Sequence, residues 1–209
     1  MSQKPVLIIG AGGHARTLIA VLRRLGLPIL GCTAMERARA GLFHQGVKIL
    51  GDDRILENIR TDGVMLVNAI GLQPARREVF EKFKSRGYEF QTLIDPSVLK
   101  DESVVCLEGA QIQMGAILQT GVRVGADCIV NSGVLLEHDV EIGDHSHIAP
   151  GAILCGGVTV GAGCFIGAGT VVRQGLHIGA GATVGAGSVV VKDIPGGVVS
   201  FGHPAKIRA

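Results

Sequence analysis

Residues 142–172 read IGDHSH-IAPGAI-LCGGVT-VGAGCF-IGAGTV-V, and every block of six opens on an aliphatic residue. A period of six fits neither an amphipathic helix, with about 3.6 residues per turn, nor a strand, in which every second residue shares a face. It does fit stacked coils that turn a corner after each block, so the repeat predicts a parallel β-helix. The spacing is unbroken over fourteen positions: Ile112, Leu118, Val124, Val130, Leu136, Ile142, Ile148, Leu154, Val160, Ile166, Val172, Ile178, Val184 and Val190.

A second position, two residues before each aliphatic one, holds small or branched side chains such as Ala152 and Val158. We expect them to turn inward near the corners, where little room remains, and glycines to carry the bends. Three blocks per coil give roughly 4.7 coils over residues 111–194. Val98 and Val104 keep the spacing, but the step from Val104 to Ile112 is eight. We therefore expect an interrupted register there, with an irregular first coil at 95–110.

Before the repeat, short apolar segments alternate with helical ones. This alternation is typical of a βαβ domain with a parallel sheet, here a Rossmann-like α/β fold. Asp95-Pro96 marks the boundary, because a proline after a strand redirects the chain. We predict an α/β domain over 1–94 and a β-helix domain over 95–209. The expected strands are 6–9, 28–32, 64–69 and 89–94, and the expected helices are 15–25 and 74–86.

The turn Gly10-Ala11-Gly12-Gly13-His14-Ala15 joins the first strand to the first helix and satisfies G-x-G-x-x-A. Glycines let a phosphate approach the backbone, and the N–H groups and dipole at a helix N-terminus favour an anion. A tight turn without a ligand is the alternative. A redox dinucleotide would also need an acid after the second strand, and Thr33-Ala34 stand there, with no acid before Glu36. The sequence therefore favours a nucleotide-diphosphate ligand over NAD.

Ionisable residues gather in one window of the repeat, Glu137-His138-Asp139, Glu141 and Asp144-His145-Ser146-His147. A solvated face would carry lysine as well as glutamate, and this window has no lysine. Histidine, with an unperturbed pKa of about 6.5, can accept a proton near neutral pH, and an adjacent carboxylate fixes its tautomer. His138 with Asp139 or Glu137 is such a pair if it lies at a corner, because neighbours on a strand point to opposite faces.

The other histidines of this window have simpler interpretations. We expect His145 at the surface, and strand alternation points His147 outward between the inward Ser146 and Ile148. A metal site with Asp144 is the alternative, but the spacing matches no common metal motif, so we expect no metal.

Composition excludes several classes of partner. A net charge of +2, no tryptophan and a single tyrosine argue against nucleic-acid binding. The apolar run at 6–9 is cut short by Gly10, so we expect neither a signal peptide nor a membrane span. The five cysteines show no C-x-x-C spacing. We expect reduced core thiols in a cytoplasmic protein, with a metal or disulfide role as the alternative.

Four features occur together in order along nearly the whole chain: the G-A-G-G-H turn, the hexapeptide repeat, the window at 137–139 and the ending Gly202-His203-Pro204-Ala205-Lys206. In this combination the chain resembles bacterial sugar acetyltransferases of the PglD/NeuD type. The resemblance implies a left-handed β-helix, acetyl-CoA as co-substrate, and a homotrimer with active sites between subunits. This chain departs from the family at one place. Family members usually have an acidic pair after the second strand, and this chain has Thr33-Ala34 there.

The resemblance also implies residue roles, carried over position by position. His138 would be the general base and Asp139 the carboxylate that raises its basicity. Acetyl-CoA contacts are implied at His147, Gly156, Ala168 and Ala186, with the Gly156 N–H serving the oxyanion. A nucleotide-sugar pocket is implied at Gly12, Gly13, His14 and Gly71, with Asn131 near the active site.

The expected reaction is direct acetyl transfer from acetyl-CoA to the amino group of a nucleotide-linked 4-amino-4,6-dideoxy sugar, with UDP as the favoured nucleotide. A cysteine nucleophile is not expected, because the repeat points Cys128 and Cys164 inward. One alternative is O-acetylation of a sialic acid or a related sugar by the same base. Another is a non-catalytic β-helix that only binds a ligand.

Overall fold

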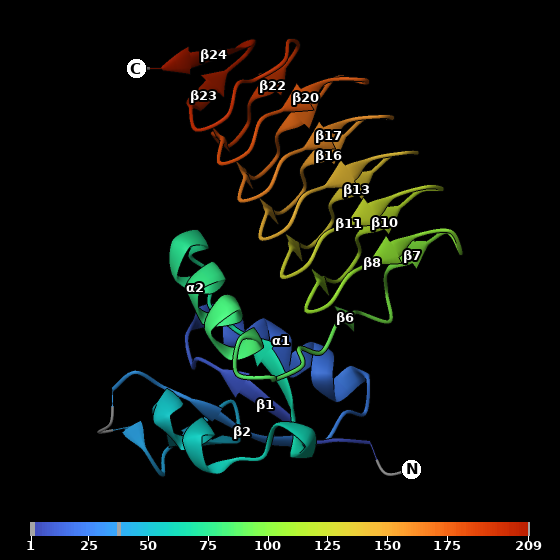
Figure 1. Ribbon diagram of the computed structural model, residues 1–209. Helices are drawn as coiled ribbons and strands as arrows, with labels where there is room; N and C mark the ends of the chain where they lie inside the picture. The colour runs from blue at the N-terminus through green and yellow to red at the C-terminus, as the bar shows by residue number, and fades with distance from the viewer. Residues whose placement is uncertain (1–2, 37–38, 209) are drawn as a thin grey trace. The chain divides into compact units, whose positions relative to one another are not determined.

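The structure is a computed structural model that describes residues 3–36 and 39–208. The chain divides into two compact units, Met1–Thr92 and Leu93–Ala209, and the second unit is the stack of coils in Figure 1. The division falls two residues before the expected boundary, because β6 (Leu93–Ile94) pairs with β9 (Gln111–Ile112) and so belongs to the stack.

The first unit is built on a five-stranded sheet in the order β3-β4-β2-β1-β5. The strands run parallel except β3, which pairs antiparallel with β4. Every residue of β1 is at most 1% exposed, as expected for a central strand covered on both faces. The predicted Rossmann-like α/β fold is confirmed. Its elements are β1 (Val6–Ile9), α1 (Gly13–Arg24), β2 (Ile29–Thr33), β3 (Phe43–His44), β4 (Val47–Gly51), η2 (Asp53–Asn58), η3 (Thr61–Gly63), β5 (Met65–Asn68) and α2 (Gln73–Lys84).

Two details of the first unit differ from the prediction. Segment 89–94 is not a strand of this sheet, because only Phe90 forms a bridge, to Leu66, before the chain enters the β-helix. Strands β3 and β4 are not predicted from the sequence, because β3 holds only two residues and Gly46, in the left-handed region with φ of 74, lies between the two strands.

The second unit is a left-handed parallel β-helix with three faces. We call the six-stranded sheet β22-β19-β16-β13-β10-β7 the apolar face and the five-stranded sheet β20-β17-β14-β11-β8 the groove face. The eight-stranded sheet, which ends in β23 and β24, is the hairpin face. Strands that neighbour each other on a face lie one coil apart, as Leu135 pairs with Ile153. The remaining strands are β7 (Leu99–Lys100), β8 (Val105–Cys106), β10 (Ile117–Leu118), β11 (Arg123–Val124), β12 (Ile129–Val130), β13 (Leu135–Leu136), β14 (Glu141–Ile142), β15 (His147–Ile148), β16 (Ile153–Leu154), β17 (Thr159–Val160), β18 (Phe165–Ile166), β19 (Val171–Val172), β20 (His177–Ile178), β21 (Thr183–Val184), β22 (Val189–Val190), β23 (Val199–Gly202) and β24 (Ala205–Arg208).

Three kinds of corner connect the faces. Corner 1 leads from the hairpin face to the apolar face, corner 2 from the apolar face to the groove face, and corner 3 from the groove face to the hairpin face. The third residue of each corner from 109 to 187 has a positive φ, which favours glycine. Asp127, Asp139 and His145 are the exceptions, with φ of 51, 58 and 61. Asp and His enter this region more readily than most residues.

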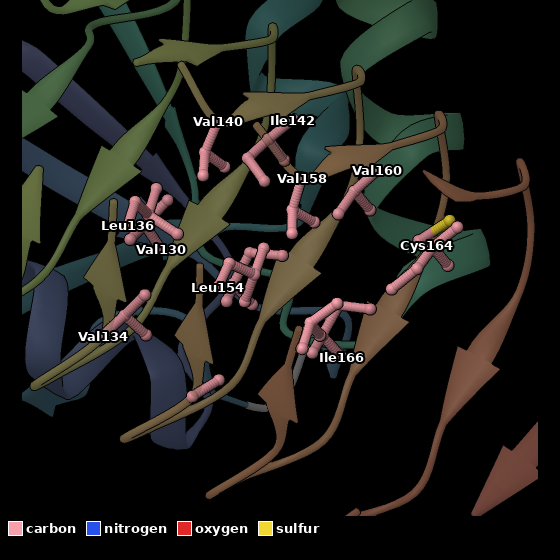
Figure 2. Close-up of a cluster of buried hydrophobic side chains, with 14 of the residues drawn as sticks. Val130, Val134, Leu136, Val140, Ile142, Leu154, Val158, Val160, Cys164 and Ile166 are labelled. Carbon is pink, nitrogen blue, oxygen red and sulfur yellow. The ribbon is translucent and has the colours of Figure 1, made fainter. Parts of the chain in front are cut away.

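Side chains of the repeat fill the axis of the stack (Figure 2). All fourteen predicted aliphatic residues are at most 3% exposed, and the small position is equally buried, with Leu176 the most exposed at 6%. Its polar members are paired: Ser146 Oγ donates to the Gly161 carbonyl at 2.9 Å, and Thr170 Oγ1 donates to the Gly185 carbonyl at 3.2 Å. The predicted core of the β-helix is confirmed.

The expected interruption of the register before Ile112 is wrong. Val98 and Val104 occupy the small position of their blocks, so the step of eight joins two different positions of the repeat. Lys100 stands at an aliphatic position because it is exposed in the first coil, where no earlier coil covers the apolar face. The strand ends of this coil keep a spacing of six: Ile94, Lys100, Cys106 and Ile112.

A hairpin closes the opposite end of the stack. Strand β23 continues the hairpin face parallel to β21, and β24 then turns back antiparallel to β23. The Arg208 guanidinium lies 5.0 Å from the centre of the Phe201 ring and ties the two strands together.

Candidate active site

His138 and Asp139 form a contact pair at corner 2. Nδ1 of His138 lies 3.0 Å from Oδ2 of Asp139, and the two side chains are 61% and 72% exposed. Adjacent residues can meet here because the left-handed backbone of Asp139 breaks the strand alternation. The carboxylate that contacts the ring is thus that of Asp139, not that of Glu137.

Main-chain hydrogen bonds hold this pair between two neighbouring coils. The Asp139 N–H donates to the Thr120 carbonyl at 3.0 Å, and the Gly157 N–H donates to the His138 carbonyl at 2.8 Å. Because the Asp139 carboxylate accepts the proton of Nδ1, the lone pair of a neutral ring lies on Nε2. An exposed imidazole in this tautomer can take a proton from an attacking nucleophile.

At several corners within the described residues, the N–H of the second residue has no hydrogen-bond acceptor in the chain. Across residues 3–36 and 39–208, no chain atom accepts a hydrogen bond from the N–H of Gly156, Ala168 or Ala186. Ala168 and Ala186 lie on successive coils of corner 1, and both are exposed. Two unpaired donors in a row along one edge suit a ligand that runs parallel to the stack.

Asn131 and His147 meet at the hairpin face. Oδ1 of Asn131 accepts the Ser132 N–H at 2.8 Å, and this bond directs Nδ2 to within 3.2 Å of Nε2 of His147. An amide nitrogen can only donate, so Nε2 of His147 accepts and its proton lies on Nδ1. The ring also packs edge-on against Phe165, with centroids 5.3 Å apart. His147 lies on the outer side of its strand, as predicted, and is half-buried.

The predicted site residues of the β-helix fall at two separate edges of one chain. His138, Asp139 and Gly156 lie at corner 2, whereas Asn131, Ala168 and Ala186 lie at corner 1. The apolar face separates the two corners. A single chain therefore brings the predicted base next to Gly156, but not next to the predicted coenzyme contacts Ala168 and Ala186.

The apolar face carries an uninterrupted outward row of aliphatic side chains. Leu99 is 67% exposed, and the other members are partly exposed. The groove face differs, because Arg123, Glu141 and His177 point outward there and line a groove of about 380 Å³. A continuous apolar strip of this kind marks a contact surface. Its members are Leu99, Ile117, Leu135, Ile153, Val171 and Val189.

His145 is not a surface residue, contrary to expectation. Its side chain is 12% exposed, and Nδ1 lies 3.0 Å from Oδ2 of Asp127, whose side chain is fully buried. Asp127 stands one coil earlier, so local sequence does not reveal the contact. In the same corner, Asp144 Oδ1 accepts the Ala126 N–H at 2.7 Å. Corner 3 therefore uses its ionisable residues to join successive coils.

Replacing Asp127 by alanine should destabilise the β-helix by about 3 kcal/mol, because it removes one partner of a buried pair. Alanine is also strained in the left-handed backbone of this position. Thermal unfolding should show a midpoint lower by about 6–12 °C. Asp127→Asn is the matched control, since Asn tolerates this backbone and keeps an acceptor for His145, and it should lose less. An alanine variant that melts within about 2 °C of the wild type would contradict the assignment.

A pocket of about 470 Å³ in the first unit gathers the four residues predicted for the nucleotide sugar, Gly12, Gly13, His14 and Gly71. An added Cβ at Gly12 or Gly13 would meet nothing within 4 Å, so the space over the turn is open. Helix α1 has no acidic residue in its first turn and no side-chain N-cap. Its N-terminal N–H groups therefore suit an anion.

Thr33 occupies the position where the resemblance implies an acid, and it has a structural role. Its buried Oγ1 accepts the Gly10 N–H at 3.1 Å and donates to Asp53 Oδ1 at 2.6 Å, so it supports the glycine turn. Within the described chain, two charged side chains line this pocket, those of Glu36 and Arg39. A guanidinium nitrogen of Arg39 lies 3.6 Å from a carboxylate oxygen of Glu36. Arg39 is not predicted from the sequence, because no motif links it to the glycine turn.

Among the described residues, no group of three or more His, Cys, Asp or Glu could hold a metal ion. All five cysteines are free thiols. Burial raises the pKa of Cys106 to about 11 and also raises the pKa of Cys164, which disfavours the nucleophilic thiolate. Over the same residues, no helix has the length and apolar character needed to cross a bilayer.

Comparisons with known proteins agree with this architecture. Residues 5–83 match the family model of the PglD N-terminal domain, and residues 139–174 and 157–192 match that of the bacterial transferase hexapeptide repeat. PerB from Caulobacter crescentus, solved with CoA and GDP-perosamine, is 35% identical, covers 100% of this chain and 99% of its own, and has a TM-score of 0.93. The acetyltransferase domain of PglB from Neisseria gonorrhoeae, solved with acetyl coenzyme A, is 29% identical, with coverage of 99% and 100% and a TM-score of 0.92. No curated protein matches the sequence.

Proposed function

Because this chain belongs to the PglD-type family of hexapeptide-repeat sugar acetyltransferases, we propose that it acetylates the amino group of a nucleotide-linked 4-amino-4,6-dideoxy sugar, with His138 as general base. The chain is an acetyltransferase, and acetyl-CoA is its co-substrate. This sets aside the non-catalytic alternative. The observation that carries the residue-level proposal is the His138–Asp139 contact at an exposed corner.

In this reaction the sugar amine attacks the thioester carbonyl carbon, and Nε2 of His138 takes the proton that the nitrogen loses. The Asp139 carboxylate stabilises the resulting imidazolium through Nδ1–H. A base of this kind contributes about 10²–10⁴-fold to the rate. The Gly156 N–H would hold the oxyanion, and one such donor contributes roughly 3 kcal/mol. Collapse breaks the C–S bond, and His138 returns its proton to the thiolate of CoA, so no acyl-enzyme forms.

The active site would form between two chains of a homotrimer. The apolar face is flanked by corner 1, with Ala168 and Ala186, and by corner 2, with His138. Packing of these faces around a three-fold axis would bring corner 1 of one chain toward corner 2 of the next. Acetyl-CoA would then accept hydrogen bonds from Ala168 and Ala186 of one chain beside His138 of its neighbour, with Asn131 and His147 extending the first edge.

The nucleotide would bind in the pocket of the first unit, with its diphosphate over Gly12 and Gly13 at the N-terminus of α1. UDP is the nucleotide expected from the sequence, whereas PerB is solved with GDP-perosamine. A perosamine N-acetyltransferase at 35% identity supports an amine as the acceptor over the hydroxyl of a sialic acid. Location in the cytoplasm stays a prediction.

A panel of acceptors tests the proposed function. The purified protein is given acetyl-CoA and a thiol reagent with UDP- and GDP-linked 4-amino-4,6-dideoxy sugars, their 4-hydroxy counterparts, and sialic acid. We expect thiol release with the amino sugars, and a product heavier by one acetyl group in mass spectrometry. The hydroxy counterparts serve as matched controls and should release none. Release with sialic acid alone would replace the proposal by O-acetylation, and no release with any acceptor would contradict it.

A further inference from the structure

Gly156 is an exception among the residues at its position of the repeat. It is the second residue of a corner, and in all the other blocks from 114 to 186 the equivalent residue has a side chain. Alanine occurs there five times, so this position of the turn accepts a Cβ. The series is Met114, Thr120, Ala126, Ser132, His138, Asp144, Pro150, Gly156, Ala162, Ala168, Gln174, Ala180 and Ala186.

The backbone of Gly156 does not require glycine either. Its φ lies outside the left-handed region, unlike that of Gly157, whose φ is 68. In such a conformation glycine is usually the less stable choice, because it adds freedom to the unfolded chain. Something other than the turn must therefore favour glycine at 156.

The ring of His138 supplies the reason. A Cβ built on Gly156 would lie 2.3 Å from Nε2 of His138, 2.5 Å from Cε1 and 2.9 Å from Cδ2, and these are its three nearest atoms. His138 is the residue one coil earlier in the same column of corner 2. The imidazole thus rests directly on the bare Cα of Gly156. Any side chain there would push the ring away.

We propose that Gly156 is a positioning residue that seats the imidazole of His138 and fixes the direction of its Nε2 lone pair. The role rests on the proposed function of His138, and it is separate from any hydrogen bond that the Gly156 N–H makes to the acyl oxygen. Asp139 packs against a glycine on the other side, since its Oδ1 lies 2.5 Å from a Cβ built on Gly121, one coil earlier, although the φ of 75 at Gly121 favours glycine in any case. The dyad is therefore held between glycines of the coils before and after it.

A double-mutant cycle separates this role from the alternatives. Gly156→Ala keeps the N–H but displaces the ring, and a misplacement of about 1 Å can cost about 10²-fold. We expect its kcat to fall by about 10–100-fold, with the KM for acetyl-CoA changed less than about threefold. In the His138→Ala background the methyl group has no ring to meet, so adding Gly156→Ala should change kcat by less than about twofold. Ala180→Ser, which adds one atom at the equivalent position of corner 3, is the control and should keep the wild-type kcat.

Stability provides a second readout of the same cycle. Gly156→Ala should lower the unfolding midpoint in the wild-type background, and leave it unchanged or raise it in the His138→Ala background. A Gly156→Ala enzyme with wild-type kcat would contradict the proposal that Gly156 positions the His138 ring. So would a further tenfold loss in the double variant, because Gly156 would then act without the ring. Full activity of His138→Ala alone would instead reject the proposed function.

Discussion

Replacing His138 by alanine should lower kcat by about 10²–10⁴-fold, because in the proposed mechanism the attacking amine then lacks the group that accepts its proton. The side chain is 61% exposed and contributes nothing to the core, so the variant should fold and melt like the wild type. Binding of acetyl-CoA, measured by calorimetry, should be nearly unchanged. Thiol release with the best amino sugar of the acceptor panel measures the loss.

The control for this variant is His177→Ala. His177 is also an exposed histidine of the β-helix, but it lies on the groove face, where Nδ1 is 2.8 Å from Thr159 Oγ1. It should retain activity within about threefold, since a surface substitution away from the site has a small effect. Equal activities of the two variants would remove His138 from the mechanism.

Replacing Ile153 by glutamate should abolish both the proposed trimer and the activity while leaving each chain folded. Ile153 is in the middle of the aliphatic row, half-exposed in the single chain, and its neighbour Leu154 already fills the core. A carboxylate buried without a partner in an interface is destabilised by several kcal/mol, and about 2.8 kcal/mol corresponds to a 10²-fold weaker association. Light scattering should find monomers, and thiol release should fall at least about 10²-fold.

Ile153→Val keeps the row apolar and should form the proposed trimer with wild-type activity. A monomeric Ile153→Glu protein that still transfers acetyl groups at the normal rate would show that one chain holds a complete site. In that case the separation of corner 1 from corner 2 would need another explanation.

The β-helix could be predicted because its signal is periodic and local. Each aliphatic residue of the repeat is buried, and only the first coil was assigned in the wrong register. That error has a physical origin, because valine suits both the small and the aliphatic position, so Val98 and Val104 alone do not reveal which position they occupy. The first unit gave a weaker signal, since β3 and β4 are a short hairpin around Gly46.

The contacts in and around the candidate site could be predicted where the two residues are adjacent in sequence, but not where they lie one coil apart. His138 and Asp139 are neighbours in sequence, and the corner that joins them follows from the repeat. Two other contacts join residues that lie one coil apart: Asp127 contacts His145, and the ring of His138 packs on Gly156. Such contacts can be recognised only when each block is compared with the block three positions later, because three blocks make one coil. The bond from Thr33 to Asp53 has no periodic signal at all.

The hairpin of β23 and β24 has a consequence for solubility. A column of parallel coils ends in open backbone donors and acceptors, which could add another molecule end to end without limit. Here β24 runs the opposite way along the hairpin face, and it carries the charged Lys206 and Arg208. On this face an incoming coil would meet an antiparallel strand that carries two positive charges. On the hairpin face, β24 thus blocks the addition of another parallel strand, and a chain shortened before Val199 would leave β21 open for such pairing.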